Sequence, residues 1–326
     1  MTQKALIYTT KIQEDAPPDD KDVLDEAEFA SGVLEKIGYE VEQKQYTCGR
    51  RVEEEIKKIK PFFIFNFVEA VDKKDSMAHI APYLFEKLGI PYTGCPASAF
   101  FKTETKVNAK IILKENKILT PYWLTLKDLQ REDILRIKKR FLIKSNIDHA
   151  SKNLEATLLD DKEKIKEALH TIGGDFFAEE YIEGREFNVS IIGRLGEGKV
   201  LPPAEMLFTN WPEDKLKIVD YAAKWDENSH GYKNTVRTFN FPKRDLPLIE
   251  TICSISEKCW DLFDLRGYAR IDFRVKDNIP YVLEINVNPC ISSDAGFIAA
   301  AHQAGMSDEQ VIRNIIRDSC GERFVL

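Results

Sequence analysis

The most constraining feature of this chain is a pair of strand-like segments, GYARIDFRV and YVLEINVNP, on either side of the polar turn KDN. Side chains alternate between the two faces of a strand, and a short turn makes neighbouring strands antiparallel. The turn position predicts a hairpin in which Asp272 and Glu284 lie opposite each other, with Cβ atoms about 5 Å apart. Asn286 and Asn288 follow Glu284 at every second position, before a proline ends the strand. One face of the hairpin should therefore carry two carboxylates and two carboxamides.

These polar side chains predict a cation site. Two unpaired carboxylates at this distance repel each other, and a hard cation removes the repulsion. Oxygen ligands without histidine or thiolate suit Mg²⁺, or Mn²⁺, which also binds waters and substrate phosphates. Arg270 lies on the same strand face as Asp272, and a shared phosphate would explain a positive charge beside a metal. The alternative is an ordinary polar face in contact with solvent.

Length and composition limit the class of protein. A chain of 326 residues is expected to form two or three packed subdomains, and its net charge of −7 argues against a general nucleic-acid binder. The N-terminal segment MTQKALIYTT reads as a first strand and not as a signal peptide. No apolar run approaches the ~20 residues that span a bilayer. The cysteines are scattered and the histidines do not cluster, so we expect a cytoplasmic protein with free thiols and no zinc site.

The order of the expected elements predicts an α/β chain with three parts. Residues 1 to about 98 follow a β-α-β-α-β pattern, which predicts a small open parallel sheet flanked by helices. A lysine-rich amphipathic helix in TKVNAKIILKENKI follows, and then two strands on either side of the helix KEKIKEALHTI. From residue 185 the strands read as antiparallel, with a hairpin across LGEG, an irregular stretch over 209–235 and a helical tail. We therefore expect domains at 1–100, 101–184 and 185–326.

A second group of candidate residues lies on the two middle strands. Lys144 ends the apolar strand of RFLIKSN, where a lysine needs a charged partner or reaches solvent at the strand edge. Glu179 ends the strand of FFAEEYIEGRE, a linker follows at Tyr181 and Ile182, and Glu186 lies further along. A linker strand between two lobes can offer adenine a carboxylate or carbonyl and apolar walls, and a second acid can hold a ribose. A solvated acidic face is the alternative.

Taken together, these segments resemble the D-alanine–D-alanine ligase family of the ATP-grasp fold, and the resemblance covers nearly the whole chain. Its specific part is the series ARIDF, LEINVNP and QAGMS, because the family has Arg-Ile-Asp on one strand, Leu-Glu-x-Asn-x-x-Pro on the next and Gln-Ala-Gly-Met-Ser in the tail. The segment GIPYTG is also similar. The resemblance implies an ATP-grasp fold that is α/β overall and α+β in its C-terminal half. An open parallel-sheet domain precedes it at the N-terminus.

The resemblance also implies roles for single residues. Asp272, Glu284 and Asn286 would hold two Mg²⁺ ions, and Arg270 would stabilise the tetrahedral intermediate and the transferred phosphate. Lys224 matches the lysine of a mobile loop that closes over the γ-phosphate. The implied ATP contacts are Lys106, Lys144 and Ser151 at the phosphates, Glu179, Tyr181 and Ile182 at adenine, and Glu186 at the ribose. The implied substrate contacts are Asn288 and Ser292.

The chain departs from the family where the family binds its amino acids. The ligase begins with Gly-Gly-x-Ser-x-Glu, whose Glu binds the first D-alanine amine, whereas this chain has YTTKIQEDAPPDDKD. After the proline the chain reads CISSDAGF, and Ala295 stands where the ligase has a carboxylate-binding serine. The acidic stretch over residues 14–20 favours an amine or another cationic group as its partner. D-alanine is therefore expected to support little turnover, unless Ser292 or Ser293 replaces the missing serine.

The sequence thus predicts an ATP-dependent ligase that joins a small carboxylate to an amine through an acyl phosphate. One alternative is a true D-alanine–D-alanine ligase with diverged substrate loops. Another is a non-catalytic nucleotide-binding protein, which the glycine-poor segment SNIDHASKN favours and the metal trio opposes. The expected partners are small molecules, without nucleic acid or membrane, and the sequence leaves a homodimer open.

Overall fold

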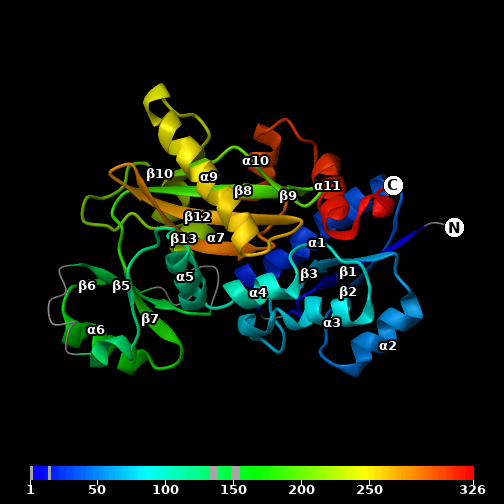
Figure 1. Ribbon diagram of the computed structural model, residues 1–326, viewed down its shortest axis with the longest axis horizontal. Helices are drawn as coiled ribbons and strands as arrows, with labels where there is room; N and C mark the ends of the chain where they lie inside the picture. Colours follow the sequence, from blue (N-terminus) through cyan, green and yellow to red (C-terminus); the bar gives the residue numbers. More distant parts are fainter. Residues whose placement is uncertain (1–2, 14–15, 132–138, 148–154) are drawn as a thin grey trace.

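The computed structural model describes residues 3–13, 16–131, 139–147 and 155–326. Figure 1 shows three sheets: a large sheet covered by helices, a smaller sheet beside the N-terminus and another smaller sheet at the opposite end of the molecule. The sheets have three, four and six strands. Each lies within one of the three residue ranges expected from the sequence, and we retain this division into domains as a proposal.

The N-terminal sheet is parallel, with strand order β2-β1-β3. The expected strand β1 (Lys4–Thr9), helix α1 (Pro18–Lys36), strand β3 (Phe63–Phe67) and helix α3 (Ile80–Leu88) are all present. Sequence reasoning missed β2 (Glu40–Gln45) and α2 (Arg50–Ile59). Strand β2 has the polar sequence EVEQKQ because it lies at the sheet edge, where most of its side chains meet solvent. It therefore lacks the apolar run that marks a buried parallel strand.

The middle sheet is antiparallel, with strand order β4-β7-β5-β6. The helices α4 and α5 lead into it, and α6 packs against β5 and β7. The lysine-rich helix and the two strands around KEKIKEALHTI appear as expected. The bounds are α4 (Ala97–Thr103), α5 (Lys106–Glu115), β4 (Trp123–Leu124), β5 (Phe141–Ser145), β6 (Glu155–Leu159), α6 (Lys162–Ile172) and β7 (Phe176–Glu180).

The C-terminal sheet has the order β11-β10-β8-β12-β13, and β9 also pairs with β8. The hairpin across LGEG is confirmed, but its second strand is two strands, because Pro202 and Pro203 interrupt the ladder. The stretch over 209–235 is less irregular than expected, since it contains two short helices. The bounds are β8 (Arg185–Arg194), β9 (Glu197–Val200), β10 (Ala204–Phe208), α7 (Tyr221–Trp225), α8 (His230–Asn234), β11 (Thr235–Thr238), β12 (Tyr268–Lys276) and β13 (Ile279–Val287).

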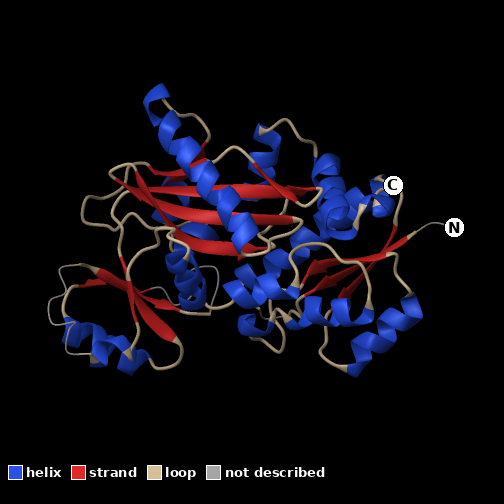
Figure 2. Ribbon diagram, in the orientation of Figure 1, coloured by secondary structure: helices blue, strands red, loops and turns tan. Residues whose placement is uncertain are grey.

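Helices cover this sheet and connect it to the N-terminal domain. Helix α9 (Leu246–Leu262) crosses the sheet, as Figure 2 shows, and contacts β8, β9, β12 and β13. The expected helical tail forms α10 (Gly296–Gln303) and α11 (Asp308–Cys320), and α11 packs beside α1. One apolar core therefore combines the first sheet with the tail helices. Short 3-10 turns occupy Asp75–Met77, Asp128–Gln130, Lys243–Asp245 and Glu322–Phe324. Among the described helices, none has the length and apolar character needed to cross a membrane.

Candidate active site

The hairpin of β12 and β13 has the predicted register. Asp272 pairs with Glu284 and Arg270 pairs with Asn286, and the ladder shifts by one residue just after Asp272. On its other side, Asp272 pairs with Asn188 of β8, which adds a second amide to the cluster beside Asn286. Sequence reasoning missed Asn188, although its position in the alternating strand EFNVSIIGR could have suggested it.

Protein groups occupy the oxygens of both carboxylates. Arg270 donates two bonds to Asp272, from Nε at 2.7 Å and from Nη2 at 2.9 Å. Asn188 and Asn286 donate side-chain amide hydrogens to the same carboxylate at 2.8 and 3.0 Å. The Lys106 ammonium lies 3.2 Å from Glu284. Two carboxylates and amide side chains on adjacent strands fit a hard cation such as Mg²⁺, provided that these protein groups give way to it.

Positive charges surround this cluster. Burial opposes the charge on Arg270, but Asp272 and Glu284 outweigh it and raise the pKa of Arg270 on balance. Lys224 on α7 lies close enough that Arg270, Glu284 and Asp272 all act on it. Solvent reaches part of the Lys224 side chain, yet the surrounding protein and then Arg270 lower its pKa. An anion between these two cations would relieve their mutual repulsion.

Asn288 does not lie on the predicted face. Strand β13 ends at Val287, and Asn288 has a positive φ of 49°, so the alternation stops at Asn286. Its side chain is buried, accepts the Cys95 amide at 2.9 Å and donates to the Asn66 carbonyl at 3.5 Å. The geometry therefore supports a structural bridge to the N-terminal domain and gives no support for the expected contact with substrate.

The nucleotide side of the site contains a lysine that sequence reasoning did not assign. Lys110 is 1% exposed, and its Nζ lies 2.6 Å from Glu179 Oε1 and 2.8 Å from Thr120 Oγ1. The Lys144 ammonium contacts the other oxygen of Glu179. Burial alone would raise the pKa of Glu179, but the two lysines lower it on balance, whereas burial lowers the pKa of Lys110. Lys110 and Lys144 share the single carboxylate of Glu179. The charged form of Glu179 is therefore favoured despite its burial, whereas the charged form of Lys110 is not.

The segment TKVNAK could have suggested Lys110 as a site residue, because Lys106 and Lys110 are four residues apart and such residues share one face of a helix. Lys106 and Lys110 accordingly lie one turn apart on α5, toward Glu284 and Glu179 respectively. The remaining nucleotide candidates lie nearby: Ile182 is buried after β7, and Glu186 on β8 forms an ion pair with Arg274. Ser151 lies outside the described residues.

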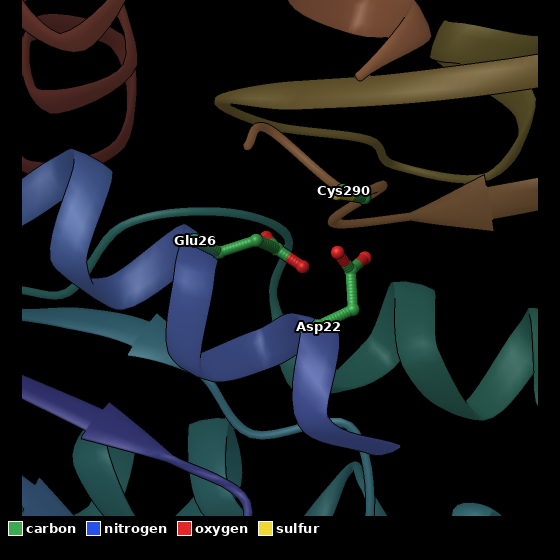
Figure 3. Close-up of side chains that lie close together, drawn as sticks. All are labelled: Asp22, Glu26 and Cys290. Carbon is green, nitrogen blue, oxygen red and sulfur yellow. The ribbon is translucent and has the colours of Figure 1, made fainter. Parts of the chain in front are cut away.

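A second polar cluster joins the N-terminal domain to the segment after β13. Asp22 and Glu26 are four residues apart on α1 and point toward Cys290, as Figure 3 shows, and their ligand atoms lie within 4.8 Å of one another. Glu26 is 2% exposed, and its Oε2 accepts a hydrogen bond from the Ile291 amide at 3.3 Å. Burial raises the pKa of Asp22, Glu26 and the Cys290 thiol, and the neighbouring acids add to it.

A buried tyrosine adds an unused polar group to this cluster. Tyr268 on β12 is fully buried, and its hydroxyl has no hydrogen-bond partner among the described residues. Burial raises the pKa of Tyr268, and among the neighbouring acids Glu26 contributes most to raising it further. Ser292, expected to contact substrate, lies beside the cluster and is 5% exposed. Its hydroxyl lies 3.1 Å from Cys290 Sγ and donates to Asp294 at 2.9 Å.

Comparison with known proteins identifies the family of this chain. The family described as D-ala D-ala ligase C-terminus matches residues 154–317, which is half of the chain. The chain belongs to the D-alanine–D-alanine ligase family. D-alanine–D-alanine ligase A of Bacillus cereus is 28% identical over 240 residues, covering 72% of this chain and 73% of that protein. An uncharacterized protein of Sinorhizobium fredii is 27% identical over 259 residues, covering 78% and 73%.

A solved structure supports the same assignment for the fold. The structure of D-alanine–D-alanine ligase from Bacillus anthracis complexed with ATP has a TM-score of 0.74 and 21% sequence identity, and the match covers 98% of this chain and 97% of that one. The ATP-grasp fold and the N-terminal parallel-sheet domain are therefore confirmed. Family membership also confirms the expected class of enzyme, an ATP-dependent ligase resembling D-alanine–D-alanine ligase.

Proposed function

We propose that this member of the D-alanine–D-alanine ligase family phosphorylates a small carboxylate with ATP and joins it to an amine other than D-alanine. The observation that carries the proposal is the meeting of two sites at β12 and β13. Asp272, Glu284 and Arg270 supply the groups for phosphoryl transfer, and Cys290 lies a few residues beyond them beside Asp22. Cys290 follows the end of β13 by three residues, so the two sites are adjacent along the chain.

In this proposal Lys106, Lys144, Lys224 and Arg270 bind and orient the phosphates. The γ-phosphoryl group moves from ATP to a substrate carboxylate oxygen, which gives ADP and an acyl phosphate. An amine nitrogen then attacks the acyl carbon, phosphate leaves, and the amine loses a proton to complete the amide. The protein contributes positioning and fixed positive charge, because phosphoryl transfer needs little covalent participation from side chains.

Asp272, Glu284 and Asn286 are the residues that would hold Mg²⁺. When bound, the metal neutralises phosphate charge and aligns the oxygens for in-line transfer. The donor set fits this role, because both carboxylates already lie against cationic side chains, Arg270 at Asp272 and Lys106 at Glu284. Lys224 would exclude water from the acyl phosphate when its segment closes.

The cluster of Asp22, Glu26 and Cys290 would recognise the substrate's cationic nitrogen. A buried acid pair is ordinarily neutralised by a cation, and the groups that act most strongly on these two acids are other acids and hydrogen-bond donors. A protonated amine could also use the free Tyr268 hydroxyl. Residues 14–15 of the acidic stretch lie outside the described residues, and the two carboxylates that would meet the nitrogen belong to α1.

The decisive experiment is an ADP-release screen of the purified protein with MgATP and pairs of small carboxylates and amines, followed by mass spectrometry of the product. We expect an amide product from a pair that does not include D-alanine, and little ADP from D-alanine alone. Efficient D-alanyl-D-alanine formation, at about 10⁴ M⁻¹s⁻¹ or more, would restore the reaction named for the Bacillus cereus relative. The absence of any MgATP-dependent thermal shift would instead favour a non-catalytic protein.

A further inference from the structure

Arg274 is a buried arginine on β12 with an unusual set of partners. It is 4% exposed and pairs in register with Glu186 on β8. Its Nη2 lies 3.0 Å from Glu186 Oε2, and its Nη1 donates to the Gly184 carbonyl at 3.0 Å. Nη2 also donates to the carbonyl of Lys217. One guanidinium therefore contacts the linker after β7, the acid expected at the ribose, and a segment more than 30 residues further along the chain.

The backbone of Lys217 is held by Arg274. Its carbonyl accepts a hydrogen bond from the Arg274 guanidinium. The Arg274 guanidinium also lies against the aromatic rings of Tyr181 and Phe208, with its central carbon 5.8 and 5.9 Å from the two ring centres. Lys217 precedes α7, the helix that carries Lys224. The start of the Lys224 segment is thus fixed to the linker through the Arg274 side chain.

This arrangement depends on the shape of the arginine side chain. A guanidinium presents five hydrogens in a rigid plane and can bond several acceptors at once, whereas a lysine ammonium is a point charge on a flexible stem. The linker has no space to adjust, since a Cβ on Gly184 would lie 2.0 Å from the Val275 carbonyl oxygen. Lysine at position 274 would keep the charge but could not reach all three acceptors in this geometry.

We propose that Arg274 is a positioning residue, which aims Glu186 at the ribose of ATP and anchors the Lys224 segment to the linker. The inference rests on the proposed function, because it needs a nucleotide at this site. Arg274 does not touch the reacting atoms. It fixes one oxygen of Glu186 and leaves the other for a ribose hydroxyl, and it sets where the chain toward Lys224 begins.

The test compares Arg274→Lys and Arg274→Gln with a matched control, Arg185→Lys. Arg185 lies next to Glu186 on the same strand, and its guanidinium binds Glu205 and Asp245 at 2.7 Å, away from Lys217. The KM is measured for ATP, 2′-deoxy-ATP and 3′-deoxy-ATP by ADP release, or the Kd by calorimetry. We expect both Arg274 variants to raise the value for ATP roughly ten- to hundredfold, the effect of losing one or two charge-assisted bonds.

A purely structural arginine would not change ribose recognition. In the Arg274 variants the discrimination against the deoxy nucleotides should fall toward one, and it should stay unchanged in Arg185→Lys. In double-mutant cycles with Glu186→Gln, the effects on ATP binding should be strongly non-additive for Arg274→Lys and additive for the control Arg185→Lys. Trypsin should also cleave faster after Lys217 in the Arg274 variants, with and without MgATP.

The outcomes separate the two proposals. If the wild-type protein binds no MgATP, the proposed function fails, and this inference fails with it. The wild type could bind MgATP while Arg274→Lys still discriminates against the deoxy nucleotides and still resists trypsin cleavage after Lys217. In that case only the positioning role is refuted. Arg274→Gln supplies the same readouts if Arg274→Lys is unstable, because its amide can still bond one carbonyl.

Discussion

Replacing Lys110 with methionine should destabilise the middle lobe strongly. Lys110 is 1% exposed and its Nζ lies 2.6 Å from Glu179 Oε1, and Glu179 itself is 3% exposed. Removing one partner of a buried ion pair costs about 3–5 kcal/mol, because the other charge stays buried. Lys144 still contacts Glu179 in this variant, and methionine fills the space of the lysine stem. We therefore expect the lower end of that range, about 3 kcal/mol.

Two further variants measure the coupling between Lys110 and Glu179. Glu179→Gln should cost more, about 4–5 kcal/mol, because it leaves Lys110 buried beside a second cation, Lys144. The double variant Lys110→Met/Glu179→Gln should recover to a loss of about 1–2 kcal/mol, because it retains no fully buried charge. The Lys144 side chain is 24% exposed and can reach water in that variant. The effects of the single variants should therefore be far from additive.

Native-state hydrogen exchange read by mass spectrometry is the suitable assay, because it reports the opening of one lobe in a chain with several. Peptides from β5 and β7 should exchange roughly a hundredfold faster in Lys110→Met than in the wild type, which corresponds to about 3 kcal/mol. Peptides from β1 and β3 serve as the internal control. Exchange within about threefold of the wild type, or additive effects in the double variant, would refute the reasoning.

Further predictions concern the metal site, the nucleotide and the acid pair. Glu284→Gln should abolish ADP release while the melting temperature without nucleotide stays within a few degrees, and full turnover would exclude a metal role. Lys144→Ala should reduce the rise in melting temperature that MgATP produces, and an unchanged rise would place the phosphates elsewhere. Burial raises the pKa of Glu26, so its contribution to stability is present below its unfolded pKa and lost as the pH rises through the folded value. Glu26→Gln should flatten this dependence in urea unfolding between pH 5 and 8, and a dependence equal to that of the wild type would contradict the assignment.

The sequence predicted the parts of the fold that repeat a local pattern. Asp272 and Glu284 lie opposite each other as predicted, but the turn alone does not set this pairing: the pairs next to the turn are one residue out of that register, and an irregularity just after Asp272 restores it. The polar edge strand β2 was missed because an exposed strand carries no apolar run. Asn288 was placed on the wrong face because a single residue with positive φ ends the alternation, and asparagine adopts that conformation more readily than most residues.

The site was less predictable wherever it depends on packing between distant segments. Nothing local to α1 indicates that Glu26 meets Cys290, since the two are 264 positions apart and are brought together by the tail helices that pack on α1. Lys110 carried a helical spacing signal, but its burial depends on the β7 carboxylate that it meets. Sequence patterns therefore identified residues that share an element or a hairpin and missed pairs that join elements far apart in the chain.

The pairing of Arg270 with Asp272 leads to a last prediction about how metal and nucleotide bind. The Asp272 carboxylate accepts two bonds from Arg270, so the arginine that should bind phosphate is held by the acid that should bind metal. Asp272→Asn removes the negative charge beside the phosphates and releases Arg270. It should therefore tighten binding of ATP in the presence of EDTA, while the gain in affinity on adding Mg²⁺ shrinks.

Calorimetry of ATP with EDTA and with excess Mg²⁺ measures both effects. The wild type should show coupling between metal and nucleotide of about 1–3 kcal/mol, the usual size of such linkage. The matched control is Asn188→Ala, because Asn188 contacts the same carboxylate without carrying charge and should leave the order of the two affinities unchanged. If Asp272→Asn weakens ATP binding equally with and without Mg²⁺, then Asp272 does not hold Arg270 back from the phosphates, and Arg270 does not exchange partners when ATP binds.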